Sequence, residues 1–123
     1  MIYTTYFGNL RNLPEDIVPI AICGWAPSWY TGLQYKKLAP KASFFSKWKE
    51  THDNDYYIDC FDKQVLSKLD PVVVVTELTR KAKDKQFALV CYERPEDFCH
   101  RRLVADWLNK NGYETKEFVG GAK

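Results

Sequence analysis

Three short apolar runs constrain the fold of this chain most strongly. They cover residues 2–7, 17–23 and 87–92, and each one stops at a glycine or at a polar segment. The second run has almost no polar alternation, which is typical of a strand buried on both faces of a parallel sheet. Parallel strands need long crossover connections between them. The chain between the runs should therefore supply helices.

Helical spacing of apolar residues does occur between and after these runs. The predicted helices cover residues 42–52, 56–69, 71–83 and 99–111. In the third helix we expect Val72, Val75, Leu78 and Ala82 to face the core. The segment Val72–Val75 also fits a strand by propensity, but Asp70 and Pro71 form a good N-cap and first-turn pair. Residues 113–118 should form a short final strand.

This alternation predicts an α/β fold. We expect residues 1–123 to form one compact Rossmann-like domain, because 123 residues suit a single core. Its parallel or mixed sheet should have about four to five strands, flanked by helices and covered on both faces. Residues 119–123 are expected to be a frayed tail. Ligands of open sheets of this kind bind beyond the carboxyl ends of the strands.

Charge and composition narrow the possible partners and compartments. The 18 basic and 16 acidic residues give a net charge of +2, which is too balanced to indicate nucleic-acid binding. No apolar run approaches the ~20 residues of a membrane span, and the first residues do not resemble a signal peptide. We therefore expect a cytoplasmic protein. Its four cysteines are few for the length, so no disulfide framework is expected.

Cys99 and His100 are the first candidates for chemistry. They follow the strand run 87–92 and stand where a helical pattern begins. A helix N-terminus beside an imidazole and a guanidinium lowers a thiol pKa, so Cys99 could be a nucleophile with His100 as its catalytic partner. Alternatively, Cys99 is only a small buried side chain.

Glu93 and Arg101 are the next candidates. Glu93 could act as a general base just past the strand end, or it could cap the next helix or pair with an arginine. Arg101 could bind a phosphate or carboxylate of a ligand, whereas Arg102 points about 100° away on the helix and should be solvated.

Other predicted strand ends add possible ligand-binding residues. Gly8 and Arg11 follow the first strand, and Trp25 opens the aromatic and lysine-rich loop 24–41 after the second. Aromatic rings and cations could stack a base and hold phosphates, or the loop could simply pack on the sheet. Cys91 lies near the end of the third predicted strand and is the last of these possible ligand-binding residues.

The sequence contains residues that could bind a metal ion, but their spacing does not favour a metal site. Cys91, Cys99 and His100 are residue types that zinc favours. Neighbouring Cys99 and His100 rarely reach one ion from the first turn of a helix, and no paired C-x-x-C motif is present. We accordingly expect neither a metal nor a cofactor.

Two motifs resemble a known family. Cys91-x-Glu93 followed by Cys99-His100-Arg101 is similar to the signature of the family called domain of unknown function 488. Residues 32–40, GLQYKKLAP, resemble a G-x-x-Y-x-x-L-A-P segment of one branch, and the likeness extends over residues 1–118. It implies a small α/β protein with a Rossmann-like arrangement and no established activity. Many members have a Gly-His-Ser-like turn where this chain has Phe7-Gly8-Asn9.

These observations lead to two main functional hypotheses. A third, weak nucleic-acid binding through the lysine-rich faces, is disfavoured by the modest net charge. In the first, the protein binds a small phosphorylated or nucleotide-like anion and could be an enzyme. In the second, it is a non-enzymatic binding or regulatory protein with a structural Cys-His-Arg cluster. The first site would combine the candidates Gly8, Arg11, Trp25, Cys91, Glu93, Cys99, His100 and Arg101. Substrate, reaction and oligomeric state lie beyond the sequence.

Overall fold

A computed structural model describes residues 1–92 and 97–119, and it contains one five-stranded sheet. The strands are β1 (Ile2–Tyr6), β2 (Ile17–Ala21), β3 (Leu33–Gln34), β4 (Gln86–Cys91) and β5 (Thr115–Glu117). They are all parallel and stand in the order β3-β2-β4-β1-β5. The predicted α/β fold with a parallel sheet is therefore confirmed.

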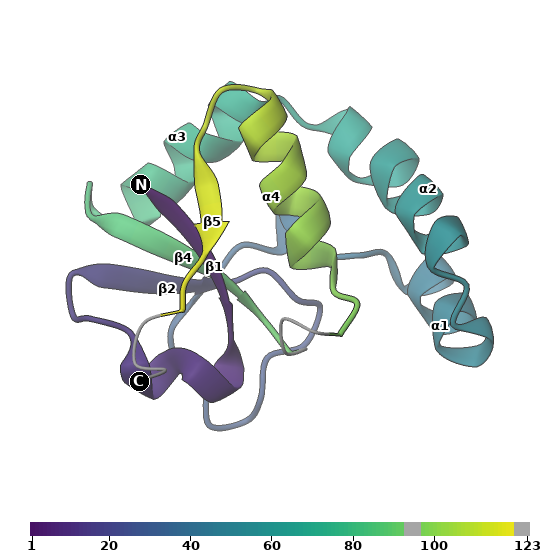
Figure 1. Cartoon of the computed structure of the whole chain (residues 1–123), viewed down its shortest axis with the longest axis horizontal. Coiled ribbons are helices and arrows are strands. Elements are labelled where there is room, and N and C mark those ends of the chain that lie inside the picture. The colour runs from purple at the N-terminus through teal and green to yellow at the C-terminus, as the bar shows by residue number, and fades with distance from the viewer. Residues whose placement is uncertain (93–96, 120–123) are drawn as a thin grey trace.

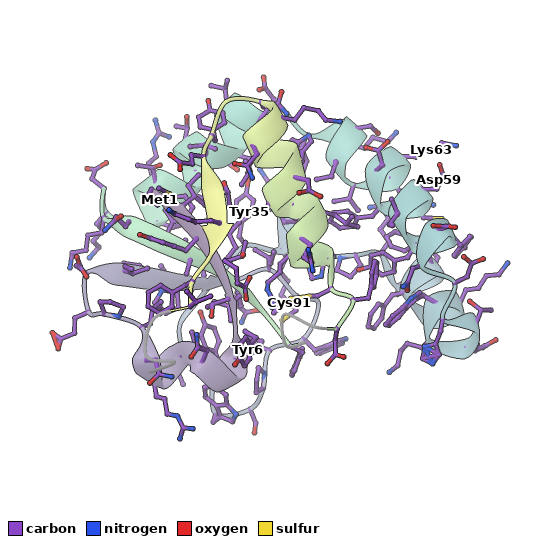
Figure 2. The ribbon with its side chains drawn as sticks, viewed as in Figure 1. Met1, Tyr6, Tyr35, Asp59, Lys63 and Cys91 are labelled. Carbon is purple, nitrogen blue, oxygen red and sulfur yellow. A yellow bond between two sulfur atoms is a disulfide. The ribbon has the colours of Figure 1, made fainter. Side chains whose placement is uncertain are left out.

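The central strand β4 aligns the ends of its two neighbours. Val90 pairs with Thr5 of β1 and with Ala21 of β2, and Tyr6 pairs with Cys91. Figure 2 shows Tyr6 and Cys91 at the same end of the sheet, with Met1 at the other end. The carboxyl ends of β1, β2 and β4 consequently lie in one row, where the sequence predicted a site.

All four α-helices pack against one face of the sheet (Figure 1). They are α1 (Ala42–Thr51), α2 (Asn54–Gln64), α3 (Pro71–Lys81) and α4 (His100–Lys110). The side chains of Phe44, Phe61, Leu78 and Leu108, one from each helix, share a core with Leu89 of β4. None of the helices in residues 1–92 and 97–119 is long and apolar enough to cross a membrane.

The opposite face of the sheet has a different cover. Its buried side chains include Ala21 and Val90, and they pack against Phe7, Leu10 and Tyr30. Leu10 belongs to the 3-10 helix η1 (Phe7–Asn12), and Tyr30 belongs to the loop after β2. Both faces are thus covered, as expected, but only one of them carries α-helices. Two further 3-10 turns are η2 (Lys36–Leu38) and η3 (Leu66–Lys68).

The helix α3 begins as its sequence predicts. The Asp70 side chain accepts a hydrogen bond of 2.9 Å from the backbone N–H of Val72, and Pro71 is the first helical residue. Residues 72–75 are therefore helical, and the strand alternative is wrong. The prediction of which side chains face the core is partly wrong too. Val72, predicted to be buried, is 58% exposed, and Val74 is buried in its place.

Candidate functional site

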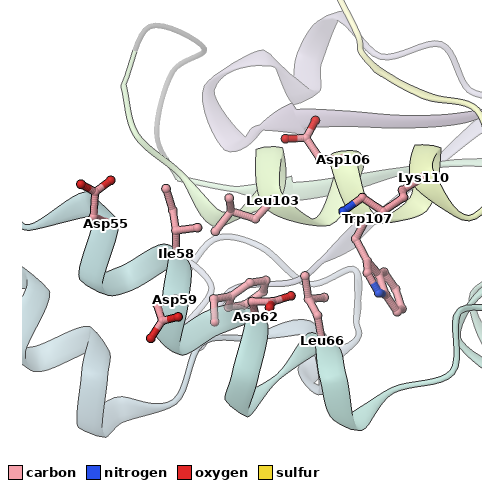
Figure 3. Close-up of a pocket in the computed structure, with 10 residues that line it drawn as sticks. Asp55, Ile58, Asp59, Asp62, Leu66, Leu103, Asp106, Trp107 and Lys110 are labelled. Carbon is pink, nitrogen blue, oxygen red and sulfur yellow. The ribbon is translucent and has the colours of Figure 1, made fainter.

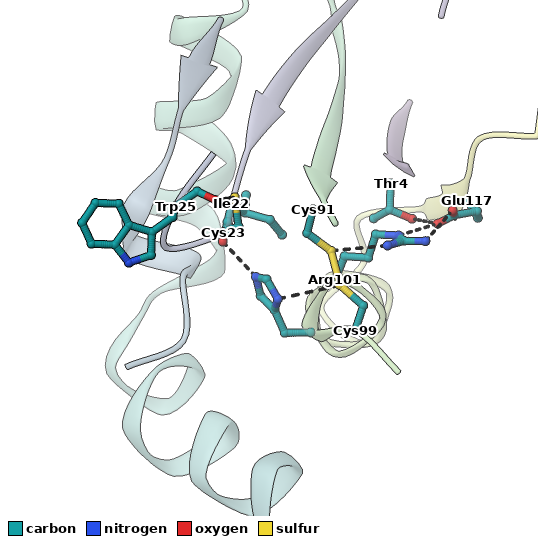
Figure 4. Close-up of a disulfide and its surroundings, with 9 residues drawn as sticks. Thr4, Ile22, Cys23, Trp25, Cys91, Cys99, Arg101 and Glu117 are labelled. Atoms are coloured by element: carbon teal, nitrogen blue, oxygen red, sulfur yellow. Dashed lines mark hydrogen bonds and ion pairs between the residues drawn. A yellow bond between two sulfur atoms is a disulfide. The ribbon is translucent and has the colours of Figure 1, made fainter. Parts of the chain in front are cut away.

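The candidate site is a buried polar cluster at the carboxyl end of β4 and the start of α4. We call Cys91, Cys99, His100 and Arg101 the Cys-His-Arg cluster (Figure 4). Their exposed fractions are only 1%, 3%, 5% and 1%. Cys99 has an extended backbone and precedes the first turn of α4, so its side chain and those of His100 and Arg101 leave the chain close to β4. The sequence-predicted neighbours Cys91, Cys99, His100 and Arg101 do come together.

A disulfide joins Cys91 to Cys99, with an S–S distance of 2.09 Å. Four cysteines in a chain of this length, and a reducing compartment, predict no disulfide framework. That expectation is corrected for this pair: the fold brings the end of β4 next to the start of α4. The sulfur of Cys99 is not a thiol in this state, so its predicted nucleophilic role requires the bond to be reduced first.

His100 is held in one tautomer by the neighbouring strand end. Its Nε2 lies 2.8 Å from the carbonyl oxygen of Ile22, and because a carbonyl only accepts, Nε2 carries the hydrogen. Its Nδ1 lies 3.9 Å from the Cys99 sulfur. Burial is the main reason that the pKa of His100 is lowered to about 4; Arg101 lowers it further, and the bond to Ile22 raises it. The ring is therefore neutral at pH 7, with an unprotonated Nδ1 facing the sulfur.

Arg101 is bound by other parts of the protein. Its Nε and Nη2 donate to the two carboxylate oxygens of Glu117, at 3.0 and 2.9 Å. Its Nη1 donates to the Cys91 sulfur at 3.3 Å, and the guanidinium lies over the Tyr6 ring. Thr4 donates a further hydrogen bond of 2.7 Å to Glu117. The guanidinium predicted to bind a ligand is thus engaged by a carboxylate and a sulfur of the protein itself.

Sequence reasoning missed Glu117 and Ile22, which complete this network. Glu117 lies 16 residues after Arg101, in the short strand β5, and Ile22 lies 78 residues before His100. A lone carboxylate in a three-residue strand and a backbone carbonyl carry no sequence signal. Only the strand order brings them to the cluster.

The remaining predicted site residues are placed elsewhere. Gly8 and Arg11 lie on η1 and are exposed, so they are not part of the buried cluster. Trp25 is 84% exposed, and its ring points away from the cluster, beside the Lys36 ammonium (Figure 4). Glu93 lies outside the described residues. Arg102 is exposed, as predicted.

A small pocket adjoins Cys99 and His100. Four aromatic side chains complete its lining, those of Phe45, Trp48, Tyr57 and Phe98. Its volume of about 20 Å³ is room for one water molecule. A larger ligand could reach the cluster from this side only if aromatic side chains moved. The rings would then offer it flat apolar faces.

A groove of about 400 Å³ between α2 and α4 is a less suitable anion site (Figure 3). Asp55, Asp59, Asp62 and Asp106 stand around an apolar floor that includes Leu103. Their charges repel an anion. No member of the Cys-His-Arg cluster is among the residues that line it.

Three atoms of the cluster could hold a metal ion. The sulfurs of Cys91 and Cys99 and a ring nitrogen of His100 lie within 4.8 Å of one another, and all three residues are buried. Neighbouring residues such as Cys99 and His100 rarely reach one ion from the first turn of a helix, and the sequence therefore predicts no metal site. The fold brings their donor atoms to one place nevertheless.

Comparison with known protein families places most of the chain in one of them. A family model described as "Active DUF488-N3 subclade", DUF488-N3a, matches residues 8–112. This range contains the strands β2, β3 and β4 in full and the whole Cys-His-Arg cluster. No curated protein and no solved structure matches the chain.

Proposed function

The chain belongs to the DUF488 family, within its DUF488-N3a subclade, and we propose that it is a thiol-dependent enzyme acting on a small anionic ligand at the Cys-His-Arg cluster. The observation that carries the proposal is the contact of one buried sulfur pair with both an unprotonated imidazole nitrogen and a guanidinium. The description of the subclade as active agrees with an enzyme.

In the reduced form, each sulfur has its own activating neighbour. The Cys99 thiol can donate a hydrogen bond to the unprotonated Nδ1 of His100, because Nε2 carries the ring hydrogen. A thiolate formed at Cys99 would favour the protonated ring, which burial otherwise disfavours. The Cys91 sulfur accepts a hydrogen bond from Arg101, whose positive charge stabilises a thiolate. Cys99 is therefore the proposed nucleophile, and the disulfide is the resting, oxidised form of the site.

The surroundings favour a ligand that is partly flat and partly anionic. The small pocket beside Cys99 is lined by aromatic rings, and if these rings move apart a base or another planar group can stack on them. The positive end of the α4 dipole lies beside the cluster and favours an anionic group there. A nucleotide-like molecule combines both properties, and it is the ligand class that we propose.

A non-enzymatic role is the second candidate, and one observation favours it. Arg101 is almost fully buried and forms a two-pronged ion pair with Glu117, as a structural arginine does. In that case the cluster would hold β4, β5 and α4 together, and a ligand would bind without reacting.

The test compares two equally buried cysteines in the wild-type protein. Cys99 is 3% exposed and Cys23 is 6% exposed, so burial alone gives them similar reactivity. After reduction in the presence of a chelator, iodoacetamide should label Cys99 about 10-fold faster than Cys23, as read by mass spectrometry of each peptide. The substitution His100→Gln should remove most of this difference, because it removes the proton acceptor.

Equal labelling of the two cysteines in the reduced protein would contradict the nucleophile role. The non-enzymatic role would then be the remaining candidate function.

A further inference from the structure

The Cys-His-Arg cluster places three metal-binding atoms in one buried spot. Cys91 Sγ, Cys99 Sγ and a His100 ring nitrogen lie within 4.8 Å of one another. Thiolate sulfur and imidazole nitrogen are the ligands that Zn²⁺ prefers in proteins. The three residues come from two elements, β4 and the start of α4, that the fold holds firmly side by side.

His100 is oriented as metal-ligating histidines usually are. Its Nε2 donates to the carbonyl oxygen of Ile22 at 2.8 Å. A bond of this kind to a backbone carbonyl fixes the tautomer and the ring orientation of a metal ligand. The lone pair is therefore on Nδ1, the nitrogen that lies 3.9 Å from the Cys99 sulfur.

The backbone positions suit an ion between the sulfurs. The Cα atoms of Cys91 and Cys99 are 7.5 Å apart. Disulfide-bonded cysteines usually have Cα atoms about 4.4–6.8 Å apart. Two sulfurs that each lie about 2.3 Å from one zinc ion accommodate a wider separation.

The charges around such an ion would balance. Two thiolates neutralise one Zn²⁺, and Arg101 already donates a hydrogen bond to the Cys91 sulfur. Hydrogen bonds from outer residues to ligating atoms are a regular part of metal sites. The charge of Arg101 is itself compensated by Glu117.

We propose that the reduced protein binds one Zn²⁺ through the sulfurs of Cys91 and Cys99 and Nδ1 of His100. An external dithiol first reduces the disulfide: the pair gains two electrons and two protons, and the dithiol becomes a disulfide. Zinc then displaces both thiol protons. Three protein ligands leave the fourth position of a tetrahedral ion to water or to a small anion.

Zinc and the proposed nucleophile use the same Cys99 sulfur. Bound zinc would therefore mask the thiol, and its release would expose it. This regulatory consequence rests on the proposed function, whereas zinc binding itself does not.

The first experiment measures binding on the full-length protein. The reduced, desalted protein is kept free of oxygen and titrated with Zn²⁺ against a chromophoric chelator, and in parallel with Co²⁺. We expect one ion per chain and a sulfur-to-cobalt charge-transfer absorption, and no binding after oxidation to the disulfide. A reduced protein that binds zinc no better than the oxidised protein overturns the proposal.

Two ligand variants and one matched control identify the atoms. Cys99→Ser removes a sulfur, and His100→Gln removes Nδ1 while a side-chain N–H can still reach the Ile22 carbonyl. Each should weaken zinc binding by more than the ~10–100-fold that the loss of an outer partner costs. Cys60→Ser, outside the disulfide, should leave binding unchanged. A loss of binding in Cys60→Ser but not in Cys99→Ser overturns the assignment.

A measurement on the wild type covers the case in which a variant fails to fold. Zinc should protect Cys91 and Cys99 of the reduced protein from alkylation and leave the rate at Cys60 unchanged. If zinc does not bind but Cys99 still reacts faster than Cys23, the zinc site is refuted and the proposed function stands. If zinc binds, but Cys99 of the zinc-free reduced protein reacts no faster than Cys23, the zinc site is supported and the proposed function is refuted.

Discussion

The neutral state of His100 links the stability of the protein to pH. The pKa of His100 is lowered to about 4, mainly by burial, whereas an unfolded histidine has a pKa of about 6.5. Between these values the unfolded chain binds more protons at this residue than the folded chain does. The contribution of neutral His100 to the stability of the folded protein is therefore complete above about pH 6.5. It is lost as the pH falls towards 4, because the unfolded chain then takes up the proton more readily.

We predict that the free energy of unfolding falls by up to about 3 kcal/mol through this group between pH 6.5 and 4. The measurement is urea unfolding of the disulfide form, with a chelator present, at several pH values. His100→Gln should remove this part of the pH dependence, and the exposed-residue variant His52→Gln should retain it. Identical slopes in the wild type and His100→Gln would contradict the prediction.

At the residue scale, the sequence located the cluster but not its bonds. Cys99, His100 and Arg101 are consecutive and follow a strand pattern, so their closeness to Cys91 could be predicted from chain order alone. The partner of Arg101 could not, because Glu117 reaches it only through the sheet. The disulfide was missed because cysteine number and compartment say nothing about the distance between two particular sulfurs.

At the scale of elements, Asp70 determines where α3 begins. Its side chain accepts from the N–H of Val72, one of the backbone donors that a helix start leaves unpaired. The valine-rich segment that follows would also suit a strand by propensity. The cap and Pro71 favour the helix.

We predict that Asp70→Ala lowers the free energy of unfolding by about 1 kcal/mol. Asp70→Asn keeps an acceptor oxygen and should cost much less. Glu50→Ala, at an exposed position of α1, is a control for the loss of one negative charge. The three variants are compared by thermal and urea unfolding, and an Asp70→Asn variant as unstable as Asp70→Ala would exclude the cap as the cause.

Elements with long patterns were predictable, and short ones were not. The helix predicted over 99–111 and the strand predicted over 87–92 differ from α4 and β4 by one residue at each end. The strand β3 consists of two exposed residues, and the apolar residues around it show no regular spacing. No sequence pattern therefore predicts this strand. The phase error at Val72 has a similar origin, since four consecutive valines leave the buried face of α3 undefined.

At the scale of the whole molecule, the strand order makes β4 indispensable. The strands β1 and β2 do not pair with each other; each pairs with β4, which is made from residues 86–91. The main core therefore cannot form before most of the chain is present. Contacts between such distant residues also slow folding.

We predict that a fragment of residues 1–85 has no cooperative unfolding transition, since it lacks the central strand. A fragment of residues 1–119 should keep the transition of the full chain, because it contains all five strands. Circular dichroism during thermal unfolding distinguishes the two. A cooperative transition in the fragment 1–85 would mean that the helices α1–α3 form a core without the sheet.

The class of the sheet, but not its order, could be predicted. The unbroken apolar run at residues 17–23 indicates a strand buried on both faces, and this property alone implies parallel neighbours. The position of β1 between β4 and β5 depends on which side of the sheet each crossover takes. No local pattern in residues 2–7 encodes that choice.

The ion pair between Arg101 and Glu117 also restricts how this chain can diverge. Removal of Glu117 alone takes away the carboxylate that is paired with a buried guanidinium, and the loss of one partner of such a pair is strongly destabilising. A small domain has only about 5–15 kcal/mol of stability in total. Descendant sequences should therefore keep both charges or replace both together. We therefore expect the short edge strand β5 to be conserved jointly with the start of α4, although 16 positions separate the two residues.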